Sequence, residues 1–134
     1  MKRLDDKVFV GGQVRPEDLP DIARAGVRTI VNNRPDGEEP GQPTAAELSR
    51  AAQALGLAYH EIPIAGGIPA AAVEDMADAL ATAPGPLLAF CRSGTRSTYL
   101  WALARAREGE SADDLRAKAA AAGYDLRPIE ASLP

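Results

Sequence analysis

Short apolar runs alternate with helical patterns along the whole chain. Apolar runs of about four to eight residues between turn residues are typical of buried strands, whereas apolar residues three and four apart indicate helices. The pattern predicts strands at 8–10, 27–31, 57–64 and 86–90, and helices at 16–25, 44–55, 69–82, 97–107 and 111–123. This alternation favours an α/β domain with a mainly parallel sheet flanked by helices on both faces.

Turn and capping residues punctuate the pattern. Gly26 follows the first helix as a left-handed stop, and Thr44 with Glu47 has the spacing of a capping box. The segment 32–43 is rich in Pro, Gly and acidic residues and is longer than most connections, which predicts a functional or mobile loop. Residues 124–134 carry too little pattern to predict an element.

Length, composition and charge narrow the class of protein. With 134 residues the chain is long enough for one core, so we expect residues 1–134 to form one catalytic domain. The net charge of −4, with no basic run, argues against a nucleic-acid partner. No apolar stretch approaches the roughly 18–20 residues of a membrane span, and the start of the chain lacks the apolar region of a secretory signal. We therefore expect no membrane partner and a cytoplasmic location.

Metal and disulfide chemistry are not expected. The chain has one histidine and one cysteine, which cannot supply the ligands of a structural zinc site or form a disulfide within the chain. We therefore predict a protein without a metal or cofactor.

The single cysteine, Cys91, lies in a loop between a predicted strand and a predicted helix. Residues 90–97 read Phe-Cys-Arg-Ser-Gly-Thr-Arg-Ser. The backbone N–H groups of such a loop, with the positive end of the next helix, form a cradle for anions. In that field, and beside Arg92 and Arg96, the thiol should have a pKa below the free value of about 8.5. Cys91 is therefore the predicted catalytic nucleophile, at the carboxyl end of a strand where α/β proteins bind ligands.

The residues around Cys91 supply the remaining contacts to an anion. Arg96 can donate to two oxygens at once, which gives it the second catalytic role. Gly94 suits a sharp turn, and Ser97 is placed to hold the thiolate or to cap the helix. The predicted substrate-binding residues are five from this loop and one arginine from the 32–43 segment: Arg92, Ser93, Gly94, Thr95, Ser97 and Arg34.

The Cys91–Arg96 loop resembles the loops of two enzyme families. Protein tyrosine and dual-specificity phosphatases have Cys-x5-Arg with a histidine before the cysteine, whereas rhodanese-type sulfurtransferases have a loop one residue shorter. This chain has the shorter length, with Phe90 in place of the histidine. Elsewhere, Val8–Gly12, Gly26–Asn32 and Tyr59–Ile64 are similar to the strand-end motifs of dual-specificity phosphatases.

Taken together, these motifs and Val31–Glu38 resemble the phosphatase-like domain found alone or fused to beta-lactamase-like hydrolases in bacteria, over residues 7 to 125. The resemblance implies a cysteine phosphatase-like architecture. It also implies a thiol acceptor or a metallo-hydrolase as partner.

The general acid separates phosphate hydrolysis from sulfur transfer. A phosphatase protonates the leaving oxygen, and such acid help contributes about 10²–10⁴ in rate. In the family layout the acid follows the strand at Tyr59–Ile64, where this chain has Ala65, Gly66 and Gly67. Asp36 is the candidate replacement and third catalytic residue, although an aspartate between Pro and Gly also suits a turn.

Sulfur transfer needs no acid, because sulfite leaves thiosulfate as a stabilised anion. The short loop, the absent histidine and the absent acid favour a sulfurtransferase that passes a sulfane sulfur from thiosulfate or a persulfide donor through a Cys91 persulfide. The first alternative is a tyrosine or dual-specificity-like phosphatase that hydrolyses a phosphate ester through a phosphocysteine. The second is a non-catalytic anion-binding or persulfide-carrier module.

Overall fold

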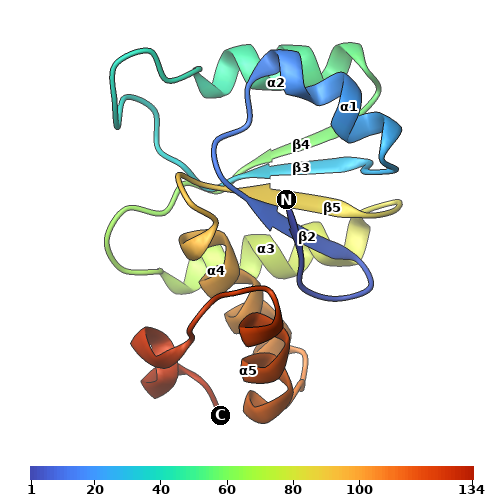
Figure 1. Cartoon of the computed structure of the whole chain (residues 1–134). Coiled ribbons are helices and arrows are strands. Elements are labelled where there is room, and N and C mark those ends of the chain that lie inside the picture. Colours follow the sequence, from blue (N-terminus) through green and yellow to red (C-terminus); the bar gives the residue numbers. More distant parts are fainter.

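A five-stranded sheet organises the computed structural model, which describes all residues from 1 to 134 (Figure 1). The strand order is β1-β2-β5-β3-β4, in which β1 pairs antiparallel with β2 and the other neighbours pair parallel. The strands are β1 (Lys2–Arg3), β2 (Val8–Gly11), β3 (Thr29–Asn32), β4 (Ala58–Glu61) and β5 (Leu87–Phe90). The prediction of a mainly parallel α/β sheet is confirmed.

Helices cover both faces of the sheet (Figure 1). They are η1 (Pro16–Asp18), α1 (Leu19–Arg24), α2 (Ala45–Ala54), α3 (Ala70–Thr82), α4 (Thr95–Arg107), α5 (Ala112–Ala121) and η2 (Arg127–Ser132). The α1 and α2 helices lie on one face, and α3 and α4 lie on the other with α5 packed outside α4. None of these helices combines the length and the apolar character needed to cross a membrane.

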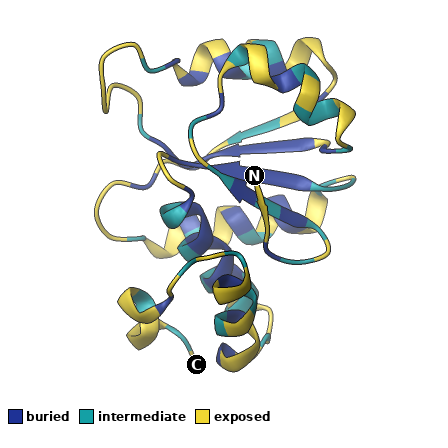
Figure 2. Ribbon diagram, in the orientation of Figure 1, coloured by how far each residue is buried: buried dark blue, intermediate teal, exposed yellow.

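The central strand β5 shows why the sheet needs cover on both sides. All four of its residues are buried, and Figure 2 shows β5 and its neighbour β3 as continuously buried strands. Leu87 and Ala89 belong to the core on the α3–α4 side, whereas Leu88 and Phe90 belong to the core on the α1–α2 side. Successive strand residues point to opposite faces, so a uniformly apolar strand requires two apolar layers.

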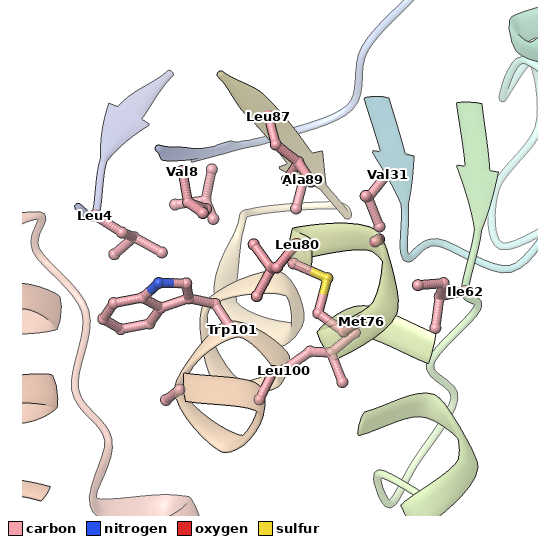
Figure 3. Packing of buried hydrophobic residues seen from close by; sticks show 14 of the residues in the cluster. Leu4, Val8, Val31, Ile62, Met76, Leu80, Leu87, Ala89, Leu100 and Trp101 are labelled. Carbon is pink, nitrogen blue, oxygen red and sulfur yellow. The ribbon is translucent and has the colours of Figure 1, made fainter. Parts of the chain in front are cut away.

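The larger core lies between the sheet and helices α3 and α4 (Figure 3). Trp101 and Leu100 from α4 and Met76 from α3 are fully buried there. The Trp101 indole N–H donates to Asp5 Oδ2 at 2.8 Å, and Arg105 Nε donates to the same oxygen at 3.1 Å. These bonds join the turn between β1 and β2 to the helix that follows the cysteine loop.

Most predicted elements are confirmed with small shifts of their ends. The capping box is present, with the Glu47 N–H donating to Thr44 Oγ1 at 3.2 Å, and Gly26 has the expected positive φ of 103°. Strand β4 is shorter than the predicted 57–64, because the chain beyond Glu61 bonds only intermittently to β3. Helix α4 begins at Thr95, two residues before the predicted start. The two-residue β1 and the 3₁₀ helix η2 were not predicted.

The carboxyl ends of the four parallel strands meet at one edge of the sheet, on the left of Figure 1. The segments 33–43, 62–69 and 91–94 leave the sheet at that edge. The fold therefore brings the cysteine loop beside the long polar loop that follows β3.

Candidate active site

Strand β5 delivers Cys91 to the carboxyl edge of the sheet between its two neighbours. The Cys91 N–H donates to Gly11 O at 3.3 Å, and the Asn33 N–H donates to Phe90 O at 2.8 Å. The cysteine is 1% exposed. Cys91 thus lies at the end of a buried strand, the position that the sequence predicts, and its role as nucleophile stays a prediction.

Gly94 turns the loop from the cysteine into helix α4. Its φ of 91° and ψ of −9° are left-handed, a conformation that glycine adopts without the strain of a Cβ atom. Its N–H donates to Cys91 Sγ at 3.1 Å, while its carbonyl accepts from the N–H and the hydroxyl of Thr98 at 2.9 and 2.8 Å. The turn thus aims one peptide N–H at the sulfur and starts the helix in the same residue.

The loop backbone favours the thiolate form of Cys91. Burial raises the pKa of this thiol, but hydrogen bonds from the backbone N–H groups of Ser97, Ser93 and Gly94 oppose it, and the net effect is a lowered pKa. The Ser97 N–H belongs to the first turn of α4, whose N–H groups lack partners within the helix. The anion cradle expected from the sequence is therefore built mainly from backbone donors.

Ser97 also ties the loop to strand β3. Its hydroxyl donates to Asn33 Oδ1 at 2.7 Å, and Asn33 Nδ2 donates to Ile62 O at 2.9 Å. Both side chains are fully buried. Ser97 therefore lies within the helix rather than at its cap, where it fixes the relative position of the cysteine loop and the sheet.

The side chains of Arg92, Ser93 and Thr95 form no hydrogen bond with the sulfur. The hydroxyls of Ser93 and Thr95 lie 3.1 Å apart on the exposed side of the loop, bonded to each other. Arg92 is exposed and forms no ion pair, and it lines a cavity together with Arg96. Ser93 and Thr95 thus offer backbone rather than side-chain contacts, whereas Arg92 is free to meet an anion.

Arg96 is held at its far end by the long loop. Its two terminal nitrogens donate to the two oxygens of Glu38, both at 2.8 Å, and Nη1 also donates to Ile64 O at 2.9 Å. Hydrogen bonding to Glu38 and the nearby Cys91 thiolate raise the pKa of Arg96 despite partial burial. A guanidinium has five N–H donors, so the Nε–H and one Nη2–H remain as a parallel pair along the other edge. That edge can bind two oxygens of one anion.

Glu38 is in turn held by a buried arginine. Arg34 is 1% exposed, and it donates to Glu38 at 2.8 Å, to Gln13 at 2.9 Å and to Glu39 at 3.1 Å. Hydrogen bonds from Arg96 and Arg34 lower the pKa of Glu38 to about 2. A cavity of about 400 Å³ opens here, lined by Arg34, Glu38, Glu39, Arg92 and Arg96. Arg34, predicted as a substrate ligand, therefore acts in this structure as a support for Glu38.

Asp36 has a different partner from the one expected of an acid. Its Oδ1 accepts the N–H of Ala45 at 2.8 Å, in the first turn of α2. It forms no hydrogen bond with Cys91 or Arg96 and does not line the cavity of the arginines. The structure therefore shows the Asp36 side chain capping the first turn of α2, nine residues further along the chain.

Four of the residues described so far in the site were not predicted from the sequence: Glu38, Glu39, Asn33 and Gln13. Glu38 had a usable signal, because a carboxylate in a loop beside an arginine-rich anion site invites an ion pair. Asn33 had a weaker one, since a polar residue directly after a buried strand needs a buried partner. Gln13 had none, because its contact with Arg34 spans 21 residues and depends on how the sheet is assembled.

The comparisons with known proteins agree with this geometry. The sequence model of the phosphatase-like domain of beta-lactamase hydrolase-like proteins matches residues 1–108. The chain belongs to this family. A beta-lactamase hydrolase-like protein of Xylella fastidiosa is 38% identical over 125 residues, which are 92% of this chain and 29% of that protein. The chain thus spans less than a third of the length of such relatives.

Solved structures place this phosphatase-like domain among cysteine phosphatases by shape. A candidate phosphatase from Neisseria meningitidis is 35% identical, with a TM-score of 0.82 over 96% of this chain and 92% of that one. TpbA of Pseudomonas aeruginosa, in complex with phosphotyrosine, is 18% identical, with a TM-score of 0.62 over 87% of this chain and 68% of that one. The second likeness concerns the fold alone. The protein is therefore phosphatase-like, and the comparisons favour the phosphatase alternative over the sulfurtransferase that the sequence predicted.

Proposed function

We propose that residues 1–134 act as one catalytic domain that hydrolyses phosphate monoesters through a phosphocysteine on Cys91. The observation that carries the proposal is the pairing of two features at one edge of the sheet. The thiol is held by loop N–H groups, with Gly94 N at 3.1 Å from Sγ, and Arg96 is fixed at its far end by Glu38. The free edge of Arg96 and the loop N–H groups then share the oxygens of a phosphoryl group.

In the proposed reaction the Cys91 thiolate attacks phosphorus and the bond from phosphorus to the ester oxygen breaks. The leaving oxygen departs with the electron pair, either as a phenolate or after taking a proton. Water then attacks the phosphocysteine, the phosphorus–sulfur bond breaks, and phosphate and the thiolate are released. Arg92 lines the cavity above this site and contacts the bound phosphate ester.

The supply of a proton decides the proposed substrate class. With its pKa held at about 2, Glu38 is ionised at neutral pH and has no proton to give. Asp36 is engaged by Ala45, and the segment Ala65–Gly67 carries no carboxylate. We therefore propose aryl phosphates as substrates, since a phenolate leaves without help from an acid. The phosphotyrosine bound by TpbA, which shares the fold, is an ester of this kind.

Sulfur transfer is the second candidate, because the loop has one residue fewer than the Cys-x5-Arg of phosphatases. A smaller ring suits the single extra sulfur of a persulfide, and this reaction needs no acid either. If the protein transfers sulfur, its partner is a thiol acceptor or a metallo-hydrolase.

One experiment separates the two. Hydrolysis of 4-nitrophenyl phosphate is compared with hydrolysis of an alkyl phosphate, and the intact mass of the protein is measured after treatment with thiosulfate. We expect turnover of the aryl ester, little of the alkyl ester, and no added sulfur. A gain of one sulfur atom on Cys91 without aryl phosphate turnover would instead establish sulfur transfer. Cys91→Ser is the control for both arms, and absence of both reactions would leave anion binding as the function.

A further inference from the structure

A tyrosine from the far end of the chain lies against the cysteine loop. Tyr124 follows α5, beyond the residues 1–108 that match the family model. Its hydroxyl donates to the carbonyl of Ser93 at 3.0 Å. A Cβ atom at Gly94 would lie 2.2 Å from that hydroxyl oxygen, so the tyrosine occupies the space beside the glycine. The ring packs against the core on the α3–α4 side.

The bond from Tyr124 fixes the direction of one peptide. In a trans peptide the carbonyl oxygen of one residue and the N–H of the next lie in one plane and point in opposite directions. The Ser93 carbonyl points outward to Tyr124, so the Gly94 N–H points inward, where it meets Cys91 Sγ at 3.1 Å. The tyrosine hydroxyl is the only protein donor to the Ser93 carbonyl.

We propose that Tyr124 is a positioning residue that holds the Ser93–Gly94 peptide in the orientation that presents the Gly94 N–H to the sulfur and to a bound anion. The inference deepens the proposed function and rests on it for the identity of that anion. Tyr124 acts through the peptide and does not itself touch the reacting atoms.

Glycine makes such a restraint necessary. A peptide next to glycine rotates more easily than others, because the residue has no Cβ to exclude the alternative backbone angles. A rotated peptide would aim the Ser93 carbonyl oxygen at the thiolate and remove one donor from the cradle. The loop would then repel the anion that it otherwise binds.

The test compares Tyr124→Phe with Tyr99→Phe. The first variant keeps the ring and removes only the hydroxyl. The second removes a hydroxyl that makes no hydrogen bond, from Tyr99, a partly buried tyrosine of α4.

The rate of Cys91 alkylation by iodoacetamide is followed against pH. In Y124F we expect the midpoint to rise by about half to one pH unit, the scale of one hydrogen bond to the thiolate. Below the midpoint, kcat/KM for 4-nitrophenyl phosphate should fall about three- to tenfold. Y99F should match the parent.

A second measurement reads the peptide itself. The amide proton of Gly94 should move upfield in the NMR spectrum of Y124F as its bond to sulfur weakens. An unchanged alkylation midpoint with an unchanged Gly94 amide overturns the inference, and so does a variant that fails to fold, because the tyrosine would then be structural. Alkylation needs no turnover, so a parent without phosphatase activity would overturn the proposed function and still leave the role of Tyr124 decided.

Discussion

The two halves of the site are built in different ways. The thiol half comes from one short stretch, because Cys91 and the Ser93, Gly94 and Ser97 groups that lower its pKa lie within seven residues. The guanidinium half is assembled from distant segments, with Arg96 bonded to Glu38 58 residues away and to Ile64 32 residues away. One half is made of backbone dipoles and the other of side-chain ion pairs.

This difference shows which part of the site forms by local folding and which part requires the assembled sheet. The backbone donors of the thiol half take their direction from the turn itself and, as proposed above, from the Tyr124 hydroxyl on the Ser93 carbonyl. A bidentate ion pair depends on charge, on salt and on the position of the 33–43 loop. The thiol half should therefore tolerate loss of the Glu38 ion pair, and the guanidinium half should not.

The largest effect is expected from Cys91→Ser, which removes the nucleophile and leaves the cradle. A hydroxyl does not ionise near neutral pH, so turnover of 4-nitrophenyl phosphate should fall to the uncatalysed background. Thermal unfolding checks that the fold persists, since the two side chains are similar in size. Turnover equal to the parent's would show that the thiol half is not where the chemistry occurs.

Arg96→Lys should have the next largest effect. An ammonium group cannot span two anion oxygens and also hold both oxygens of Glu38. Loss of a charge-assisted contact costs about 1.5–3 kcal/mol, which corresponds to about a 10- to 150-fold fall in kcat/KM. Steady-state kinetics with an aryl phosphate measure it. The alkylation midpoint of Cys91 should move much less. A shift in that midpoint larger, in free energy, than the change in kcat/KM would show that the thiol half and the guanidinium half are not independent.

Glu38→Gln tests the long-range support of the arginine. The amide accepts one of the two bonds from Arg96 and turns an N–H₂ toward the other nitrogen, so we expect about a fivefold to thirtyfold loss in kcat/KM, equal to about 1–2 kcal/mol. If Glu38 instead competes with substrate for Arg96, kcat/KM will rise. Kinetics at low and high salt, with Glu47→Gln as the matched control, distinguish these outcomes.

The same variant gives a pH dependence of stability. The pKa of Glu38 is lowered from 4.5 to about 2 in the folded protein, so the folded state binds the proton less tightly than the unfolded state. The stabilisation is therefore present above about pH 4.5 and is lost as pH falls toward 2. Urea unfolding of the parent and E38Q should give free energies whose difference is largest at pH 6, is smaller at pH 3, and vanishes only as the pH falls below about 2. A constant difference across that range would contradict this ion-pair role.

The smallest effect on activity is expected from Asp36→Ala. Its carboxylate accepts the Ala45 N–H, so its loss should cost about 0.5–2 kcal/mol of stability, as for other helix-capping residues. The kcat/KM for an aryl phosphate should stay within twofold of the parent's value, which corresponds to a change of about 0.4 kcal/mol in activation free energy. A fall of a hundredfold or more would restore Asp36 as the acid that the sequence suggested.

Local sequence signals predicted the fold and the thiol half well. The apolar run that ends at Phe90, the glycine at 94 and the helical pattern after it identify a strand, a turn and a helix, and the structure has these three elements in that order. Strand β1 was not predicted, because its two residues, Lys2 and Arg3, are both exposed and show no alternation of apolar and polar positions.

The guanidinium half was beyond the reach of sequence patterns. Arg34 and Asp36 lie two residues apart in one loop, yet one is fully buried under Glu38 and the other is exposed at the start of α2. Which of two neighbouring polar residues turns inward is decided by partners elsewhere, here Gln13 for Arg34 and Ala45 for Asp36. Tyr124 was unpredictable for the same reason, since it meets the loop from 31 residues away.

The solitary thiol also governs how the protein responds to oxidants. A cysteine held as a thiolate is the form that peroxide converts to a sulfenic acid, and a neighbouring thiol normally captures that product as a disulfide before it oxidises further. Cys91 is the only cysteine of this chain and is 1% exposed. No resolving thiol is within the chain, so rescue depends on small thiols that can reach a buried sulfur. The concentration of such thiols around the protein therefore sets how long the Cys91 thiolate survives peroxide.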